Sequence, residues 1–263
     1  MNDRVISDIA GRLSAIDLRG FDEQTARFPM RFAKAVIVGE TPNPNRRPSI
    51  TTASATLVNL ESGPAAITCQ HVVARVLSRV TESAPQIFQI GNAVIDLQSQ
   101  LLAQDEHLDV ATIRLTPDQV AVITAGSEIG GQFFDPATWP CDRPQVGDFV
   151  AFGGFPAHLR NAITFIDVEF GTWSSGASRI DASSHRQFIS PFERERWIRA
   201  YGTPEGEALT DLGGMSGGPV FILRGLRWDL VGIVKEFHEA YDTMIFAPLE
   251  RVMSDGRIEP IAV

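Results

Sequence analysis

The chain has 263 residues, of which 44% are hydrophobic and 21% charged, so it has enough apolar side chains for one large or two small domains. Its formal net charge of −9 disfavours a nucleic-acid-binding surface, which needs an excess of positive charge. No apolar run approaches the roughly 18 residues of a membrane span, and the start lacks the apolar segment of a signal peptide. We therefore expect a cytoplasmic protein that binds neither nucleic acid nor membrane.

The first predicted element is an amphipathic helix over residues 4–17. Apolar side chains recur there at spacings near three and four, at Val5, Ile6, Ile9, Leu13 and Ile16. Such stripes usually face a core. We therefore assign residues 1–25 to an N-terminal helical extension that packs on the domain, in preference to one that binds a partner.

Short strand-like segments dominate the next hundred residues. Close spacing with turn residues between the strands predicts a closed antiparallel barrel over residues 26–125. A short helix is expected directly after His71, over residues 71–77. The predicted strands are 32–38, 52–60, 65–68, 87–90, 93–97 and 110–115.

The same pattern returns after a connection at residues 126–145, which are rich in Gly, Pro and Asp. A second barrel with a short C-terminal tail is predicted for residues 146–263. We expect a mobile polar loop at 174–184 and a charged helical turn at 191–199. The predicted fold is thus all-β, with two six-stranded antiparallel barrels, a short N-terminal helix and few other helices. The strands of the second barrel are expected at 149–152, 162–173, 187–189, 219–223, 230–237 and 243–248.

The most distinctive stretch is residues 213–220, in which Ser216 lies among four glycines and before a proline. A phosphate-binding loop is disfavoured, because the Lys-Ser/Thr ending is missing and a strand-like run follows where a helix would begin. The run also satisfies G-x-S-x-G, but a nucleophile elbow needs a following helix, then an acid and a histidine. Only His238 and little further chain remain downstream, so the elbow is rejected.

Two upstream residues complete a different arrangement. His71 follows an apolar segment, and Asp109 stands at the entry of an alternating strand. Histidine, aspartate and serine in this chain order form one of the known orders of the catalytic triad. Asp105 is a competing acid, and the strand that begins at Val110 favours Asp109.

With these motifs the chain resembles the trypsin-like (chymotrypsin-fold) serine peptidases, especially the bacterial type of the high-temperature-requirement proteases. The resemblance rests on Thr68-x-x-His71, on Asp109-Val110-Ala111 and on Gly214-x-Ser216-Gly217-Gly218-Pro219. Residues 146–156 are similar to the family's first strand of the second barrel, and residues 230–234 to its cleft strand. Together these motifs span roughly Thr52 to Leu249.

The resemblance implies a serine endopeptidase, a hydrolase that cleaves peptide bonds of a protein or peptide substrate through an acyl-enzyme. Ser216 would be the nucleophile, His71 the general base and acid, and Asp109 the residue that orients the imidazole. The backbone N–H groups of Gly214 and Ser216 would form the oxyanion hole. No cofactor or metal is expected. Alternatives are a catalytically inactive trypsin-fold module that binds a protein partner, and a serine hydrolase acting on esters.

Several positions depart from the family pattern. Met215 replaces the aspartate that pairs with a newly cut N-terminus, so we expect control by loop ordering or by an activating partner protein. Thr210 stands where trypsin has its selective aspartate, with Asp211 beside it. In the cleft strand, Lys235 and Phe237 replace smaller residues. We therefore predict a specificity pocket at Thr210, Asp211, Lys235 and Phe237 that takes small or medium apolar side chains.

The two cysteines, Cys69 and Cys141, do not form a recognisable disulfide framework. Neither lies at a metal-ligand spacing from another cysteine or histidine. Cys69 is interpreted as a small buried apolar residue.

Overall fold

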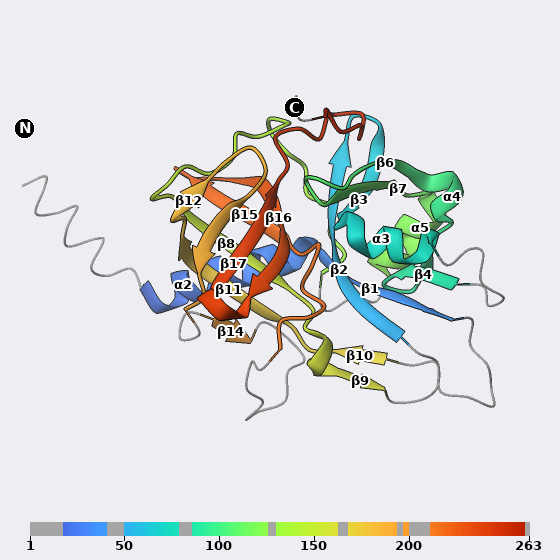
Figure 1. Ribbon diagram of the computed structural model, residues 1–263, viewed down its shortest axis with the longest axis horizontal. Helices are drawn as coiled ribbons and strands as arrows, with labels where there is room; N and C mark the ends of the chain where they lie inside the picture. Colours follow the sequence, from blue (N-terminus) through green and yellow to red (C-terminus); the bar gives the residue numbers. More distant parts are fainter. Residues whose placement is uncertain are drawn as a thin grey trace, which may run out of the picture.

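The computed structural model describes residues 18–40, 50–78, 86–125, 130–162, 168–193, 197–199 and 211–260, which form two curled antiparallel sheets (Figure 1). The prediction of an all-β, chymotrypsin-like fold with few helices is confirmed. None of the helices among these residues has the length and apolar character needed to cross a membrane. The described helices are α2 (Leu18–Arg27), α3 (Gln70–Leu77), α4 (Leu97–Gln100) and α5 (Pro117–Thr124), with 3-10 turns η1 (Phe28–Phe32), η2 (Ala157–Leu159) and η4 (Glu239–Tyr241).

The first sheet has seven strands in the order β5-β4-β1-β2-β3-β7-β6. It carries helices α3, α4 and α5 on its outer side, at the right of Figure 1. Its strands are β1 (Ala33–Glu40), β2 (Ile50–Leu60), β3 (Gly63–Thr68), β4 (Gln86–Ile90), β5 (Ala93–Val94), β6 (Leu101–Asp105) and β7 (Val110–Arg114).

The second sheet has eight strands in the order β12-β13-β17-β16-β15-β8-β11-β14, and β9 pairs with β10 in a separate ribbon. This sheet lies at the left of Figure 1. Its strands are β8 (Phe149–Gly154), β11 (Trp173–Arg179), β12 (Ala182–Ser183), β13 (Phe188–Pro191), β14 (Trp197–Arg199), β15 (Pro219–Arg224), β16 (Arg227–His238) and β17 (Thr243–Pro248), and the ribbon is β9 (Arg160–Ala162) with β10 (Val168–Phe170).

Strand β2 is buried on both faces over most of its length. Its alternate residues Ala53, Ala55 and Leu57 belong to the hydrophobic core of the first sheet. On the opposite face lie Thr52, Ser54 and Thr56, which are also buried. Buried hydroxyls need hydrogen-bond partners, and those of Ser54 and Thr56 find them in the glycine-rich loop at Ser216. This strand therefore joins the two halves.

An aromatic cluster also joins the two sheets. Phe28 stacks on Trp228 with ring centroids 4.4 Å apart, and Phe134 meets Phe221 edge-on at 4.9 Å. Phe32 lies 5.4 Å from Phe221. Phe221 itself belongs to the core cluster that fills the first sheet. The two barrels thus share apolar contacts, which favours a fixed relative position.

The segment after β17 returns to the first sheet. The hydroxyl of Thr112 on β7 donates to the carbonyl of Gly256 at 2.6 Å, and Ser62 N donates to Ser254 O at 3.4 Å. Leu249 and Val252 enter the first core cluster. The predicted tail of the second barrel therefore packs on the first.

The predicted number of strands in each sheet and some of the predicted bounds are wrong. The sheets hold seven and eight strands, where six were predicted for each. Strand β6 was missed because Leu101–Asp105 does not alternate, and β12 and β14 have too few residues to produce a pattern. The predicted strand at 162–173 is divided among β9, β10 and the first residue of β11, and that at 93–97 ends in α4.

Two predicted irregular segments are strands instead. Residues 174–179 of the expected mobile loop belong to β11, with Ser174, Ser175 and Ser178 buried. A Cβ at Gly176 would lie 2.9 Å from Ala26 Cβ, so small residues let α2 cover this strand, which a polar composition does not reveal. The prediction of a helical turn at 191–199 is wrong for the residues that the structure describes, since Pro191 ends β13 and residues 197–199 form β14. The predicted helix at 4–17 lies outside the described residues.

We predict that Gly217→Ala lowers the melting temperature well below that of Gly147→Ala. Both glycines have a positive φ, +92° and +94°, so both substitutions cost about 1 kcal/mol of backbone strain. A Cβ at Gly217 would also lie 2.0 Å from Ser54 O, whereas that at Gly147 meets nothing within 4 Å. This overlap adds about 1–3 kcal/mol. Thermal unfolding followed by circular dichroism measures the difference, and equal melting temperatures would refute it.

Candidate active site

His71 is positioned by the junction between β3 and α3. The chain is extended at Cys69 and turns into the helix at Gln70, which places His71 in the first helical turn. The buried side chains of Val72, Val73 and Val76 hold the helix against the core. The side chain of His71 is 48% exposed on the opposite side, so a ligand can reach it.

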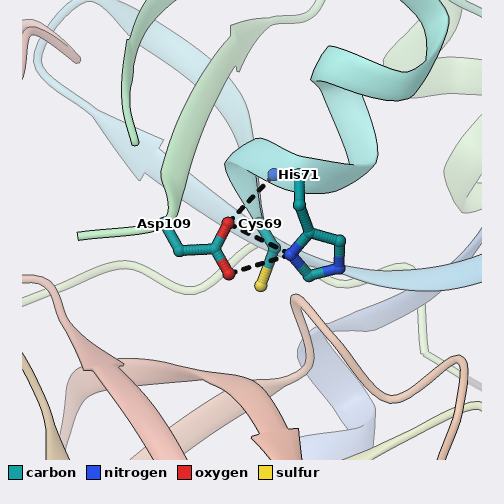
Figure 2. A group of neighbouring side chains, drawn as sticks. All are labelled: Cys69, His71 and Asp109. Carbon is teal, nitrogen blue, oxygen red and sulfur yellow. Dashed lines mark hydrogen bonds and ion pairs between the residues drawn. The ribbon is translucent and has the colours of Figure 1, made fainter. Parts of the chain in front are cut away.

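Asp109 stands immediately before β7 in a left-handed backbone conformation, with φ of 60°. This conformation is uncommon for residues other than glycine and is often associated with functional sites. It turns the carboxylate toward α3, where Oδ1 accepts from the backbone N–H of His71 at 2.9 Å (Figure 2). Asp105 is placed elsewhere, because its carboxylate accepts from Leu108 N at 2.8 Å and closes the preceding turn.

The imidazole of His71 contacts the same carboxylate. Its Nδ1 lies 2.9 Å from Oδ2 and 3.1 Å from Oδ1 of Asp109. An ionised carboxylate only accepts hydrogen bonds, so Nδ1 carries a proton. In the neutral ring, Nε2 is then left unprotonated, and Figure 2 shows it pointing away from Asp109. The ring is therefore held with its unprotonated nitrogen directed away from Asp109.

The Cys69 thiol lies beside this pair, and its sulfur is within 4.8 Å of ligand atoms of His71 and Asp109 (Figure 2). Sequence spacing missed this grouping of metal-ligand types, which the fold creates. Complete burial, and then the charge of Asp109, raise the pKa of the Cys69 thiol well above its usual value. The thiol thus stays neutral and donates to Val234 O at 3.2 Å, so a thiolate metal ligand is disfavoured.

Ser216 lies in a loop whose backbone is fixed from several sides. Its carbonyl accepts from Ser54 N at 2.8 Å, and Gly217 N donates to Val234 O at 2.7 Å. The Ser216 hydroxyl donates to the carbonyl of Lys235 at 3.0 Å. No hydrogen bond among the described residues joins this hydroxyl to His71, but both side chains line one cavity of about 380 Å³.

Gly213 and Gly214 orient the amides before the serine. Gly213 O accepts from Ala157 N at 2.6 Å. In the trans peptide between Gly213 and Gly214, the C=O and N–H bonds point in opposite directions, so the N–H of Gly214 points away from Ala157. A Cβ at Gly214 would lie 2.6 Å from Phe155 O, so the loop requires glycine there. None of the hydrogen bonds between described residues uses the N–H of Gly214 or Ser216. Both N–H groups are therefore without a hydrogen-bond partner among the described residues.

A second pocket, of about 310 Å³, also has Ser216 in its lining. Leu212, Val234, Phe237 and Met244 give it apolar walls, and Asp211, Glu236 and Glu239 add acidic groups. One carboxylate oxygen of Asp211 is engaged by Gly213 N at 2.8 Å. Of the predicted specificity residues, Asp211 and Phe237 line this pocket. Lys235 contributes its carbonyl to Ser216, and Thr210 lies outside the described residues.

Sequence reasoning missed Ser54, which supports the whole loop. Its hydroxyl donates to Gly214 O at 2.8 Å and accepts from Phe155 N at 3.0 Å. Its carbonyl accepts from the hydroxyl of Thr68 at 2.8 Å. The alternation of Thr52, Ser54 and Thr56 with apolar residues was the available signal, because it marks a polar strand face that needs partners.

The sequence profile of the trypsin-like peptidase domain matches residues 53–233. The chain belongs to the trypsin-like peptidase family. In this trypsin-like peptidase, the matched region contains His71, Asp109 and Ser216. The specific likeness to the high-temperature-requirement proteases stays a prediction. No curated protein matches the chain.

Solved structures of serine proteases and viral proteases are similar to this trypsin-like peptidase. One is the thermostable serine protease AL20 from an extremophilic microorganism, with 14% identity, a TM-score of 0.47, and coverage of 84% of this chain and 92% of that one. Another is the tobacco vein mottling virus protease, with 11% identity, a TM-score of 0.42, and coverage of 84% and 79%. A third is a catalytically inactive tobacco etch virus protease complexed with substrate, with 15% identity, a TM-score of 0.42 and the same coverage.

We predict that Ser54→Ala destabilises the protein and slows reaction at Ser216. The change leaves the buried N–H of Phe155 without its acceptor and releases Gly214 O, at a cost of about 1–3 kcal/mol. The melting temperature and the rate of labelling by a fluorophosphonate probe should both fall. Ser62→Ala, at an exposed turn, is the matched control and should change neither. Unaltered labelling of a folded Ser54→Ala variant would contradict the supporting role.

Proposed function

We propose that this peptidase is an active serine endopeptidase that uses His71, Asp109 and Ser216. The observation that carries the proposal is the contact of His71 Nδ1 with both oxygens of Asp109, in a ring that shares a cavity with Ser216. A histidine held in this tautomer has its second nitrogen available for a proton from the serine. A purely structural histidine would have no need of a nucleophile in the same cavity.

The proposed reaction starts when a peptide enters the cleft and the Ser216 hydroxyl leaves Lys235 O. His71 Nε2 takes the hydroxyl proton as Oγ attacks the scissile carbonyl carbon. The N–H groups of Gly214 and Ser216 bind the oxyanion that develops. His71 then gives the proton to the leaving amine, the C–N bond breaks, and water hydrolyses the acyl-enzyme by the reverse sequence of proton transfers.

The resting bond from Ser216 to Lys235 O is compatible with this role, because catalytic hydrogen bonds are often loose or misaligned before substrate binds. Rotation about one side-chain bond redirects the hydroxyl. Met215 is buried, so the proposed site is held without the charged pair that a new N-terminus would make. Control by an activating partner protein, like the cytoplasmic location, stays a prediction.

We predict that a fluorophosphonate probe labels the wild-type chain and labels neither Ser216→Ala nor His71→Ala. Asp109→Asn should lower the rate of peptide cleavage by about 10⁴-fold, because the tautomer is lost while the shape is kept. His107→Ala, at an exposed histidine, is the control and should label normally. A folded wild-type chain that never labels would favour the inactive, partner-binding module instead. Labelling without cleavage of any peptide would favour an esterase.

The pocket beside Phe237 is proposed to hold the side chain on the acyl side of the scissile bond. The Phe237 ring packs against Phe192 with centroids 4.7 Å apart and narrows the pocket, which suits small or medium apolar side chains.

We predict that Phe237→Ala shifts this preference toward large apolar side chains. The substitution removes a wall of the pocket, so cleavage after Phe or Leu should rise relative to cleavage after Ala or Val. Profiling on a peptide library measures the ratio. Phe149→Ala, at an exposed position on β8, is the matched control, and an identical profile for both variants would refute the assignment.

A further inference from the structure

The cavity shared by His71 and Ser216 is basic. Its described lining residues include Arg75 and Arg160 and no aspartate or glutamate, although the chain as a whole has a net charge of −9. The other pocket at Ser216 has the opposite character, with three acidic residues and no basic one among the lining residues that the structure describes. The two pockets that share Ser216 therefore differ in charge.

The chemistry of the proposed reaction decides which side receives which part of the substrate. The acyl part stays on Ser216, while the leaving amine must take a proton from His71. His71 lines the basic cavity and is not part of the acidic pocket. The basic cavity therefore lies on the side of the leaving fragment, which carries the residues that follow the scissile bond.

Both arginines are suited to bind a carboxylate there. Arg160 is half-buried, and its Nη1 donates to the carbonyl of Ile50 at 2.9 Å, which fixes the guanidinium beside the start of β2. Arg75 is exposed at the last turn of α3. None of the ion pairs between described residues includes either arginine. Each guanidinium keeps several donors for a ligand.

Thr52 supplies an independent indication of a ligand. The residue is only 6% exposed, and its hydroxyl has no hydrogen-bond partner among the described residues. It lines the basic cavity, 3.3 Å from the position a Cβ would take at Gly214. A buried hydroxyl without a hydrogen-bond partner is unfavourable. A hydrogen bond between the Thr52 hydroxyl and a bound substrate would remove this cost.

We propose that Arg75, Arg160 and Thr52 form a subsite that selects substrates with a carboxylate on the leaving fragment, at the first or second residue after the scissile bond. The carboxylate belongs to an Asp or Glu side chain or to the C-terminus of a short leaving fragment. This inference rests on the proposed peptidase function. It assigns the specificity to charge-assisted hydrogen bonds from two guanidinium groups.

The test uses a proteome-derived peptide library, amidated at its C-termini, with mass spectrometry of the new N-terminal ends. We expect Asp and Glu to exceed Asn and Gln about tenfold at the first two positions after the cut, as two partly exposed charge-assisted contacts allow. Salt at 0.5 M should reduce this ratio, since it screens exposed charges. A second library with free C-termini distinguishes the terminal carboxylate, which would enrich short leaving fragments.

Variants assign the effect to this subsite. Arg75→Gln and Arg160→Gln should each lower the acidic-to-amide ratio about threefold, in line with a single partly exposed charge pair. Thr52→Val, which keeps the shape of the side chain, should raise the KM of a cleaved acidic peptide with little effect on kcat. Arg114→Gln, at an exposed arginine on β7 outside the cavity lining, is the matched control and should keep the wild-type ratio.

Two results would overturn the inference: equal cleavage before acidic and amide residues, or an acidic preference that survives in both arginine variants. Fluorophosphonate labelling separates this failure from that of the proposed function. A wild-type chain that labels at Ser216 but shows no acidic preference removes only the carboxylate subsite. A wild-type chain that does not label removes the peptidase proposal as well.

Discussion

The hydrogen bonds between the polar face of β2 and the loop at Ser216 are the contact on which the arrangement of this peptidase depends. The loop belongs to the second half of the chain, and β2 belongs to the first. Ser54 uses its amide and hydroxyl in this contact, and Thr56 adds a bond to Gly217 O at 2.9 Å. Because the groups are buried, each lost bond leaves an unsatisfied partner, so the two halves are held in one register.

The candidate site uses this register to combine groups from separate elements. His71 comes from the start of α3, Asp109 from the turn before β7, and Ser216 from the loop before β15. The first two are joined by direct hydrogen bonds within the first half. Ser216 reaches the shared cavity because hydrogen bonds hold its loop against β2. Packing between the halves therefore determines whether Ser216 and His71 line the same cavity.

The sequence was sufficient for those parts of the fold that have a local pattern. Alternating apolar residues predicted most central strands, and the junction at His71 predicted the helix that follows it. The glycines around Ser216 predicted a loop with unusual backbone angles, which Gly214 and Gly217 adopt. By contrast, β11 was missed because its serines are polar, and they are buried only after α2 covers them.

In the candidate site, too, features that depend on neighbouring residues were predicted, and features that depend on residues far apart in the chain were not. Asp109 was preferred to Asp105 on local grounds, and the structure brings Asp109 to His71. The role of Ser54 and the grouping of Cys69 with Asp109 depend on contacts between residues far apart in the chain, which a single sequence does not report. The charge of the cavity at Arg75 and Arg160 has the same origin, since only the folded protein brings these residues of α3 and β9 to one cavity.

The burial of Met215 bears on how a cell would control the amount of protein with an assembled site. The loop around this residue is held by backbone and hydroxyl groups and by the bond from Gly213 N to the Asp211 carboxylate, and the Met215 side chain is buried in the apolar core of the second sheet. In the proposed function, a loop of this kind would assemble together with the core and would need no cleavage of the chain afterwards. Synthesis and degradation of the folded chain, rather than a processing enzyme, would then determine how much of the nucleophile a cell contains.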